Sequence, residues 1–266
     1  MIREQKQHFS TFIHIIFSER ASHFGFMRAR QILPALLLIG IGAGAAHYTS
    51  RYIPADSMQK VLPELGKTTE AIDWLRPELT RVAVTDPIAK KIVAAAHAQE
   101  GDAYDAAYRK ISFPNGDVPA KRGACTDVVV RALRGAGYDL QALINADMKS
   151  SFKSYPNSWG LDHPDKNIDH RRVPNHMKFF ERHGVSLPTG TSGDDLKTWL
   201  PGDVVCWRMD DNRLHTGIIS DGISERGMPA VIHNGWRCVE QDVLDFYSVI
   251  GHYRFPKREE QPHSQT

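Results

Sequence analysis

One cysteine stands where the chain changes from a loop to a helix, a position that can make a thiol reactive. Cys125 follows Gly123-Ala124 and precedes the apolar run Val128–Arg134, so the pattern predicts a helix that begins at Cys125. The unpaired N–H groups and positive dipole end of a helix N-terminus favour the thiolate, so we expect the pKa of Cys125 to lie below the free value of about 8.5. A thiolate of this kind attacks carbonyl carbon, and histidine is the usual base that takes its proton.

Two histidines flank short segments with strand character further along the chain. His215 precedes Thr216–Ile219, and His233 ends Ala230–His233. If these β-branched runs pair as antiparallel neighbours, the two imidazoles lie close together, His215 acting as the base and His233 orienting it. Asn234 competes with His233 for the orienting role. A buried structural cysteine and two structural histidines are the alternative interpretation of the same residues.

Charged and aromatic side chains supply candidates for contact with a substrate. Arginines of the loop Asp169–Arg172 either bind a substrate carboxylate in bidentate fashion or form an internal salt bridge that fixes the loop. Trp159 either forms the wall of a groove or anchors that loop. Asp127 either contacts the substrate or stabilises the start of the helix. The candidate substrate-binding residues are Asp127, Trp159, Asp169, His170, Arg171, Arg172 and Asn234.

The elements that would position these residues change in character along the chain. Helical patterns come first, at about 86–100, 125–134, 139–148 and 174–182. Short β-branched runs separated by turn residues follow, at 204–207, 216–219, 230–233 and 249–255. Helices followed by antiparallel strands predict an α+β domain.

An export signal is predicted near the N-terminus. Arg28 and Arg30 precede an apolar run at 32–46 that ends in Ala43-Gly44-Ala45, the pattern of a secretory signal. The run is shorter than the roughly 20 apolar residues of a membrane-spanning helix. We therefore expect a periplasmic or secreted protein, with the signal either cleaved or kept as an anchor in the inner membrane.

These features divide the chain into five parts. Residues 1–26 are either an over-extended gene start ahead of Met27 or a cytoplasmic extension, and 27–46 form the signal or anchor. A linker with short helices is expected at 47–85, the cysteine hydrolase domain at 86–256 and a polar tail at 257–266.

Charge and cysteine usage exclude two classes of protein. The net charge is +2, and residues 1–46 contribute an excess of basic residues, so the body of the chain carries no basic stripe for nucleic acid. Three cysteines occur without any CxxC pair, which gives no support for a structural zinc site. Cys206 and Cys238 lie on or beside neighbouring predicted strands, and in an oxidising compartment they either pair or remain free thiols.

Motifs across residues 92–256 resemble a bacterial family catalogued as domain-of-unknown-function family 1287. They are Ile111–Pro119, Cys125–Val128, Tyr155-Pro156, Trp159–Leu161, Asn167–Asn175, Pro201–Val205, His215–Ile218, Ile232–Asn234 and Gly251–Arg254. More distantly, the layout is similar to the NlpC-type papain-like cysteine peptidases, in which a Pro-Gly-Asp strand ending in an aromatic residue precedes the strand of the catalytic histidine. Pro201–Trp207 followed by His215–Ile219 fits that order.

The resemblance implies an α+β papain-like fold with N-terminal helices packed on a small antiparallel sheet. It also implies a cysteine amidase or peptidase that acts on peptides of the cell wall, or peptidoglycan, through an acyl-enzyme on Cys125, with His215 as base and His233 as orienting group. No metal or organic cofactor is required. The long insert between the Cys125 helix and the strands has no counterpart in the NlpC-type enzymes, so the identity of the substrate is not carried over.

Rival functions remain open at this point. The same fold serves as a module that binds the cell wall or a protein partner without cutting it. A metal-dependent hydrolase would use His215, His233 and an aspartate such as Asp221. An acyltransferase would use the same acyl-enzyme and transfer it to an amine.

Overall fold

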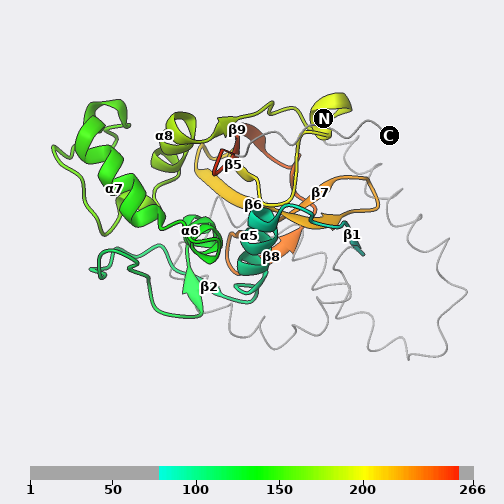
Figure 1. Ribbon diagram of the computed structural model, residues 1–266, viewed down its shortest axis with the longest axis horizontal. Helices are drawn as coiled ribbons and strands as arrows, with labels where there is room; N and C mark the ends of the chain where they lie inside the picture. Colours follow the sequence, from blue (N-terminus) through cyan, green and yellow to red (C-terminus); the bar gives the residue numbers. More distant parts are fainter. Residues whose placement is uncertain (1–77, 258–266) are drawn as a thin grey trace, which may run out of the picture. The chain divides into compact units, whose positions relative to one another are not determined.

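Helices pack against one face of an antiparallel sheet in the part of the chain that the computed structural model describes, residues 78–257 (Figure 1). Residues 1–77, which hold the expected extension, the export segment and most of the linker, lie outside the described residues, as do residues 258–266 of the tail. No helix between residues 78 and 257 has the length and apolar content that crossing a membrane requires.

Two of the longer helices begin at side-chain caps that the sequence supplies. Asp86 accepts hydrogen bonds from the backbone of Ile88 and Ala89, and Pro87 occupies the first helical position, where its missing N–H costs nothing. Asp139 accepts in the same way from the backbone of Gln141. The helices are α5 (Pro87–His97), α6 (Cys125–Gly135), α7 (Leu140–Ser151), α8 (Val173–His183) and α9 (Gly193–Leu196), with 3-10 turns η2 (Phe152–Ser154) and η3 (Asp169–Arg171).

The main sheet is antiparallel throughout and runs in the order β4-β9-β5-β6-β7-β8. Its strands are β4 (Val185–Ser186), β5 (Val204–Arg208), β6 (Leu214–Ile223), β7 (Pro229–Asn234), β8 (Cys238–Gln241) and β9 (Ser248–Arg254). β1 (Thr80–Arg81), which the sequence placed in the linker, pairs with the end of β6. β2 (Ala103–Tyr104) and β3 (Arg122–Gly123) form a separate parallel pair ahead of α6.

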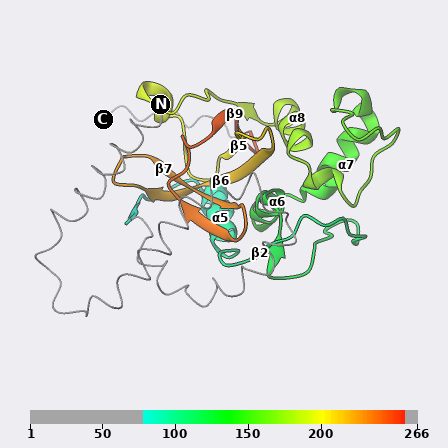
Figure 2. The same cartoon turned by 180° about the vertical axis from the view of Figure 1, so that it is seen from behind.

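The alternation of side chains gives each face of the sheet its own core. Cys206 of β5 and Ile232 of β7 pack with Cys125 and the apolar face of α6, and both α5 and α6 lie against β6. Figure 2 shows these two helices beside the sheet from the opposite side. Trp207 and Val231, one residue away on their strands, belong to the core of the other face. The predicted α+β class, with helices ahead of antiparallel strands, is confirmed.

Two of the sequence motifs meet in one buried hydrogen-bond network that joins the start of β5 to β9. The carboxylate of Asp203, with no exposed surface, accepts hydrogen bonds from Arg254 at 2.7 Å and from Nε2 of His252 at 2.9 Å. It also accepts from the backbone of Leu200, which shapes the turn before β5. Gly202 takes a φ of +85° in that turn, a conformation that favours glycine. The motifs Pro201–Val205 and Gly251–Arg254 therefore hold β5 against β9.

Candidate active site

Cys125 is the first residue of α6 and touches the sheet at β6. Its side chain is buried, with the residue 6% exposed, and it packs in the core shared by α6 and the sheet. The backbone N–H of Thr216 donates a hydrogen bond toward the Cys125 sulfur, and the N–H groups at the start of α6 do the same. The predicted helix start is therefore correct, and the thiol lies against the backbone of the residue that follows His215.

His215 and His233 face each other across neighbouring strands. Nε2 of His215 lies 2.9 Å from Nδ1 of His233, and the two rings meet edge to face. The register explains the contact, because Gly217 pairs directly with His233 and places His215 diagonally across from it. The sequence prediction that these histidines lie on adjacent strands is confirmed.

The histidine pair and the thiol approach the same stretch of β6 from its two faces. Trp207 pairs with His215 and stacks on its ring, whereas Cys206 pairs with Thr216 on the face that carries Cys125. Between residues 78 and 257 no hydrogen bond joins the Cys125 sulfur to either histidine, and Nδ1 of His215 has no hydrogen-bond partner. Because Nδ1 is attached to Cγ, it lies nearer to the strand backbone than Nε2 does. Nε2, by contrast, is already bonded to His233.

Burial dominates the protonation of these groups. It raises the pKa of the Cys125 thiol to about 11, and the charge of Asp127 adds to this, while the N–H groups of Thr216 and α6 act in the opposite direction. The expectation that the helix N-terminus brings this pKa below its usual value is wrong, because desolvation outweighs the helix. Burial also lowers the pKa of His215 to about 3 and lowers that of His233. At neutral pH the site holds a neutral thiol and two neutral imidazoles.

Gly217 is required by the close packing around His233. A Cβ atom at this position would lie 2.7 Å from Cγ1 of Val231, 2.9 Å from the carbonyl oxygen of Ile232 and 3.0 Å from Cβ of His233. The glycine of the His215–Ile218 motif thus lets β7 approach β6 closely enough for the two imidazoles to bond.

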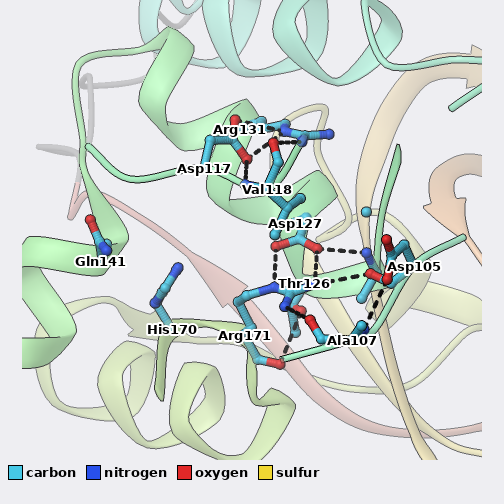
Figure 3. A network of polar contacts seen from close by, with 12 residues as sticks. Asp105, Ala107, Asp117, Val118, Thr126, Asp127, Arg131, Gln141, His170 and Arg171 are labelled. Atoms are coloured by element: carbon cyan, nitrogen blue, oxygen red, sulfur yellow. Dashed lines mark hydrogen bonds and ion pairs between the residues drawn. The ribbon is translucent and has the colours of Figure 1, made fainter. Parts of the chain in front are cut away.

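Asp127 and Arg171 form a buried ion pair that fixes the start of α6 (Figure 3). Nε and Nη2 of Arg171 each donate to the Asp127 carboxylate at 2.8 Å, and Asp127 also accepts from the backbone of Ala124 at 2.6 Å. The guanidinium donates further to the carbonyl oxygens of Asp105 and Ala107. These contacts join three separate segments around Cys125. Arg171 and Asp127 are 8% and 3% exposed, so the structure favours the internal salt bridge over contact with a substrate carboxylate.

Most of the remaining loop candidates also have internal partners. Asp169 is buried and pairs with Arg172 at 2.9 Å, and the carbonyl oxygen of buried His170 accepts from Nε2 of His176 at 2.6 Å. Arg172 lies over the ring of Trp159, 3.9 Å from its centroid. Trp159 is 43% exposed, so it and Arg172 are the loop candidates that reach the surface.

Asn234 supports the cysteine loop rather than the histidine. Its Nδ2 donates to the carbonyl oxygens of Gly123 at 2.9 Å and Asp102 at 3.2 Å. Asn234 faces the α6 side of the sheet, while His233 faces the side of Trp207. The structure therefore places His233, and not Asn234, beside His215.

Gln241 and Trp207, which the sequence did not assign to the site, lie beside the histidine pair. Gln241, in β8, places Oε1 at 3.1 Å from Nε2 of His233. Trp207 covers the histidine pair, and its own Nε1 donates to the carbonyl oxygen of Leu244. Tyr104, in β2, is 45% exposed and pairs with Gly123, two residues before Cys125. The sequence signal for Trp207 is its place at the aromatic end of the Pro-Gly-Asp strand. Gln241 gave no such signal, because β8 has no recognisable strand pattern in the sequence.

The proposed metal set of His215, His233 and Asp221 is not assembled. Asp221 lies six residues along β6 from His215, which is about 20 Å in an extended strand. Its carboxylate instead joins His97 and Glu240, whose ligand atoms all lie within 4.8 Å of one another. The guanidinium of Arg81 binds both Asp221 and Glu240 and supplies positive charge at that position.

Cys206 and Cys238 cannot pair in this fold. Both are free and buried, as is Cys125. They lie on β5 and β8, with β6 and β7 between them, so their strands are about 14 Å apart, well beyond the Cα separation of a disulfide. The expectation of neighbouring strands for these two residues is wrong.

Comparison with known proteins gives a family and two distant solved structures. A family model described as "Domain of unknown function (DUF1287)" matches residues 92–255. The uncharacterized protein YijF of Escherichia coli (strain K12) is 48% identical over 153 residues, which cover 57% of this chain and 73% of that protein.

The solved structures of NlpC1 and NlpC2 from Trichomonas vaginalis are each 16% identical to this chain, with a TM-score of 0.36. They cover 66% and 65% of this chain. The chain spans about half the length of either structure, 46% and 49%. In the described residues a helix begins at a cysteine and packs on a small antiparallel sheet, and neighbouring strands of that sheet carry two histidines.

Proposed function

The chain belongs to the family described as Domain of unknown function (DUF1287), and from that premise we propose that it is a cysteine amidase or peptidase with Cys125 as its nucleophile. The observation that carries the proposal is the arrangement on β6. The thiol of Cys125 accepts from the N–H of Thr216, and the adjacent His215 is bonded through Nε2 to His233, which leaves Nδ1 free for a proton.

The reaction proceeds by general base catalysis from a neutral pair. Nδ1 of His215 takes the thiol proton of Cys125 while the sulfur attacks the amide carbonyl carbon. The tetrahedral intermediate collapses as His215 gives that proton to the leaving amine, and a thioester remains on Cys125. Water then attacks the thioester and passes a proton to His215, which returns it to the thiol as the carboxylic acid product leaves.

A neutral resting pair is consistent with the buried setting of both groups. Separated charges in a dry site are costly, so burial keeps the proton on the thiol until the carbonyl is in place. In this step His215 must come within reach of the sulfur, and the contact with His233 stabilises the imidazolium that forms.

The proposed substrates are peptides of the bacterial cell wall. Support comes from the export segment expected at 27–46 and from the resemblance to NlpC-type enzymes. Tyr104 and Trp236 are 45% and 51% exposed and are joined by a backbone hydrogen bond at 3.0 Å. Because Tyr104 pairs with Gly123, two residues before Cys125, they offer an aromatic rim near Cys125 for a peptide. We further propose a periplasmic or secreted location, with membrane association through the N-terminal segment.

A non-catalytic binding module is the second candidate. The observation that favours it is the absence, within residues 78–257, of a hydrogen bond between Cys125 and His215, together with the raised pKa of the thiol. In that case the exposed Tyr104 and Trp236 would hold a peptide that is not cut.

Turnover of purified cell-wall fragments distinguishes the two candidates. New amino and carboxyl termini are measured by mass spectrometry for wild type, Cys125→Ala, the double variant Cys125→Ala/His215→Ala and His233→Ala. We expect both variants that lack Cys125 to be equally inactive, because the residues act in one transition state, and His233→Ala to retain more activity. Cys238→Ala, which also removes a buried thiol, is the matched control and should keep wild-type turnover. Binding of the fragments without turnover in wild type would favour the second candidate.

A further inference from the structure

We propose that Gln241 is a positioning residue that determines, through His233, which nitrogen of His215 carries the proton. The inference rests on the proposed function, because it concerns how the base of that reaction is prepared. It assigns a role to β8, the strand that closes this edge of the sheet.

The three side chains form a continuous row across three strands. Oε1 of Gln241 lies 3.1 Å from Nε2 of His233, and Nδ1 of His233 lies 2.9 Å from Nε2 of His215. In the β7–β8 register Gln241 pairs with Val231, so its side chain is the diagonal neighbour of His233 on the same face. Both separations are those of hydrogen bonds.

With Oε1 of Gln241 facing His233 and both imidazoles neutral, the donor and acceptor capacities along this row allow one arrangement of protons. The amide oxygen of Gln241 only accepts, so Nε2 of His233 must carry a hydrogen. A neutral imidazole has a single N–H, and Nδ1 of His233 is then an acceptor. Nε2 of His215 must donate to it, which leaves the lone pair of His215 on Nδ1.

This tautomer is the one that the proposed reaction needs. Nδ1 is the His215 nitrogen nearer to the backbone of β6, and Cys125 receives its hydrogen bond from that backbone at Thr216. The opposite tautomer would direct the lone pair of His215 at His233 and put a hydrogen on Nδ1. Such an imidazole could not remove the proton from Cys125.

The neighbour of Gln241 on β8 keeps the strand in register. Glu240 faces the other side of the sheet, where it accepts from Ser220 at 2.5 Å and from Arg81 at 2.6 Å. Because successive side chains of a strand point to opposite faces, these bonds direct Gln241 toward His233. β1, which carries Arg81, thereby contributes to the position of Gln241.

Nitrogen NMR of the histidines in the full chain tests the proposal without any substrate. We expect long-range proton–nitrogen spectra of wild type to show His215 as the Nε2–H tautomer at pH 7. Gln241→Met keeps the length of the side chain and removes the acceptor, so the Nδ1–H tautomer of His215 should become populated. Gln241→Glu keeps an acceptor and should restore the wild-type spectrum. A wild-type Nδ1–H tautomer, or an unchanged spectrum in Gln241→Met, would overturn the proposal.

Turnover provides a second readout that separates this inference from the proposed function. Gln241→Met should lower kcat by about 10- to 100-fold, as loss of an outer partner of a functional histidine does, with KM little changed and with recovery in Gln241→Glu. If the tautomer responds to Gln241 but wild type has no turnover, the proposed function fails and the positioning role stands. If Cys125-dependent turnover is found with a tautomer that ignores Gln241, the inference fails and the function stands.

Discussion

Nε2 of His215 and Nδ1 of His233 lie 2.9 Å apart although the two residues are 18 positions apart in the sequence. A tight β6–β7 pairing brings them together, and Gly217 makes that pairing possible. The contact occupies Nε2 of His215, and Nδ1 has no hydrogen-bond partner among residues 78–257.

Gly217→Ala should separate the two imidazoles. The new Cβ would collide with the carbonyl oxygen of Ile232 and with Cβ of His233, so β7 must shift. We expect a loss of stability of about 1–3 kcal/mol, as for other overpacked sites, together with a larger loss of turnover. Gly235→Ala is the matched control, because its Cβ would meet only Cε1 of His233 at 4.0 Å. Urea unfolding and turnover of both variants provide the check, and equal effects of the two would argue against the packing account.

The ion pair of Asp127 and Arg171 should be worth much more to stability than an exposed pair. Asp127→Leu leaves a buried guanidinium without its counter-charge, and we expect a loss of about 3–5 kcal/mol. The double variant Asp127→Leu/Arg171→Met should be more stable than the sum of the single effects predicts. Asp194→Ala, which removes the exposed partner of Lys197, should change stability by less than about 0.5 kcal/mol. A double-mutant cycle by urea unfolding measures these terms, and strict additivity would contradict the pairing.

Stability should fall as the pH decreases from 6.5 toward 4.5. Burial lowers the pKa of His170 to about 3, of His176 to about 4 and of His215 to about 3, from an ordinary value of 6.5. Below pH 6.5 the unfolded chain therefore binds protons that the folded chain does not, at a cost of about 1.4 kcal/mol per pH unit for each histidine. His97 acts in the opposite direction, because its contact with Glu100 raises its pKa.

Urea unfolding at pH 7, 6 and 5 tests this dependence. The unfolding free energy should decrease over the series, and His176→Phe, which removes one buried imidazole, should make the slope smaller whatever its effect at pH 7. A free energy that is constant or rises on acidification would show that these histidines are not held neutral.

Cys125 should react slowly with a small alkylating reagent at neutral pH. Because burial raises its pKa to about 11, the rate should increase with pH beyond 8.5 without a plateau. His215→Ala should leave this profile unchanged, since a neutral imidazole adds no charge next to the thiol. Peptide mass spectrometry separates the reaction at Cys125 from that at Cys206 and Cys238. A midpoint below 8.5 that moves upward in His215→Ala would indicate a preformed thiolate–imidazolium pair instead.

The sequence predicted the elements that carry strong local signals. Asp86 with Pro87 and the Asp139 cap marked α5 and α7, and the β-branched runs marked β5, β6, β7 and β9. β8 was missed because its four residues include Glu240, whose buried position depends on Arg81 from a distant segment. Gln241 could not be recognised without that strand.

Other features depend on spatial relations that no local pattern encodes. The strand order places β6 and β7 between Cys206 and Cys238. Whether Arg171 binds a substrate or stabilises the fold depends on its burial beside Asp127, which joins segments far apart in the sequence. Desolvation, which reverses the expected pKa shift of Cys125, likewise becomes visible only once α6 is packed on the sheet.

Trapping of the acyl-enzyme tests the central claim most directly. Cell-wall peptides are mixed with wild type, Cys125→Ala and Cys238→Ala, the reaction is quenched in acid within milliseconds to seconds, and the protein is mapped by mass spectrometry. The account predicts a thioester adduct on Cys125 in wild type and in Cys238→Ala, sensitive to hydroxylamine and absent from Cys125→Ala. Undiminished release of new termini by Cys125→Ala, with no adduct on wild type, would contradict it.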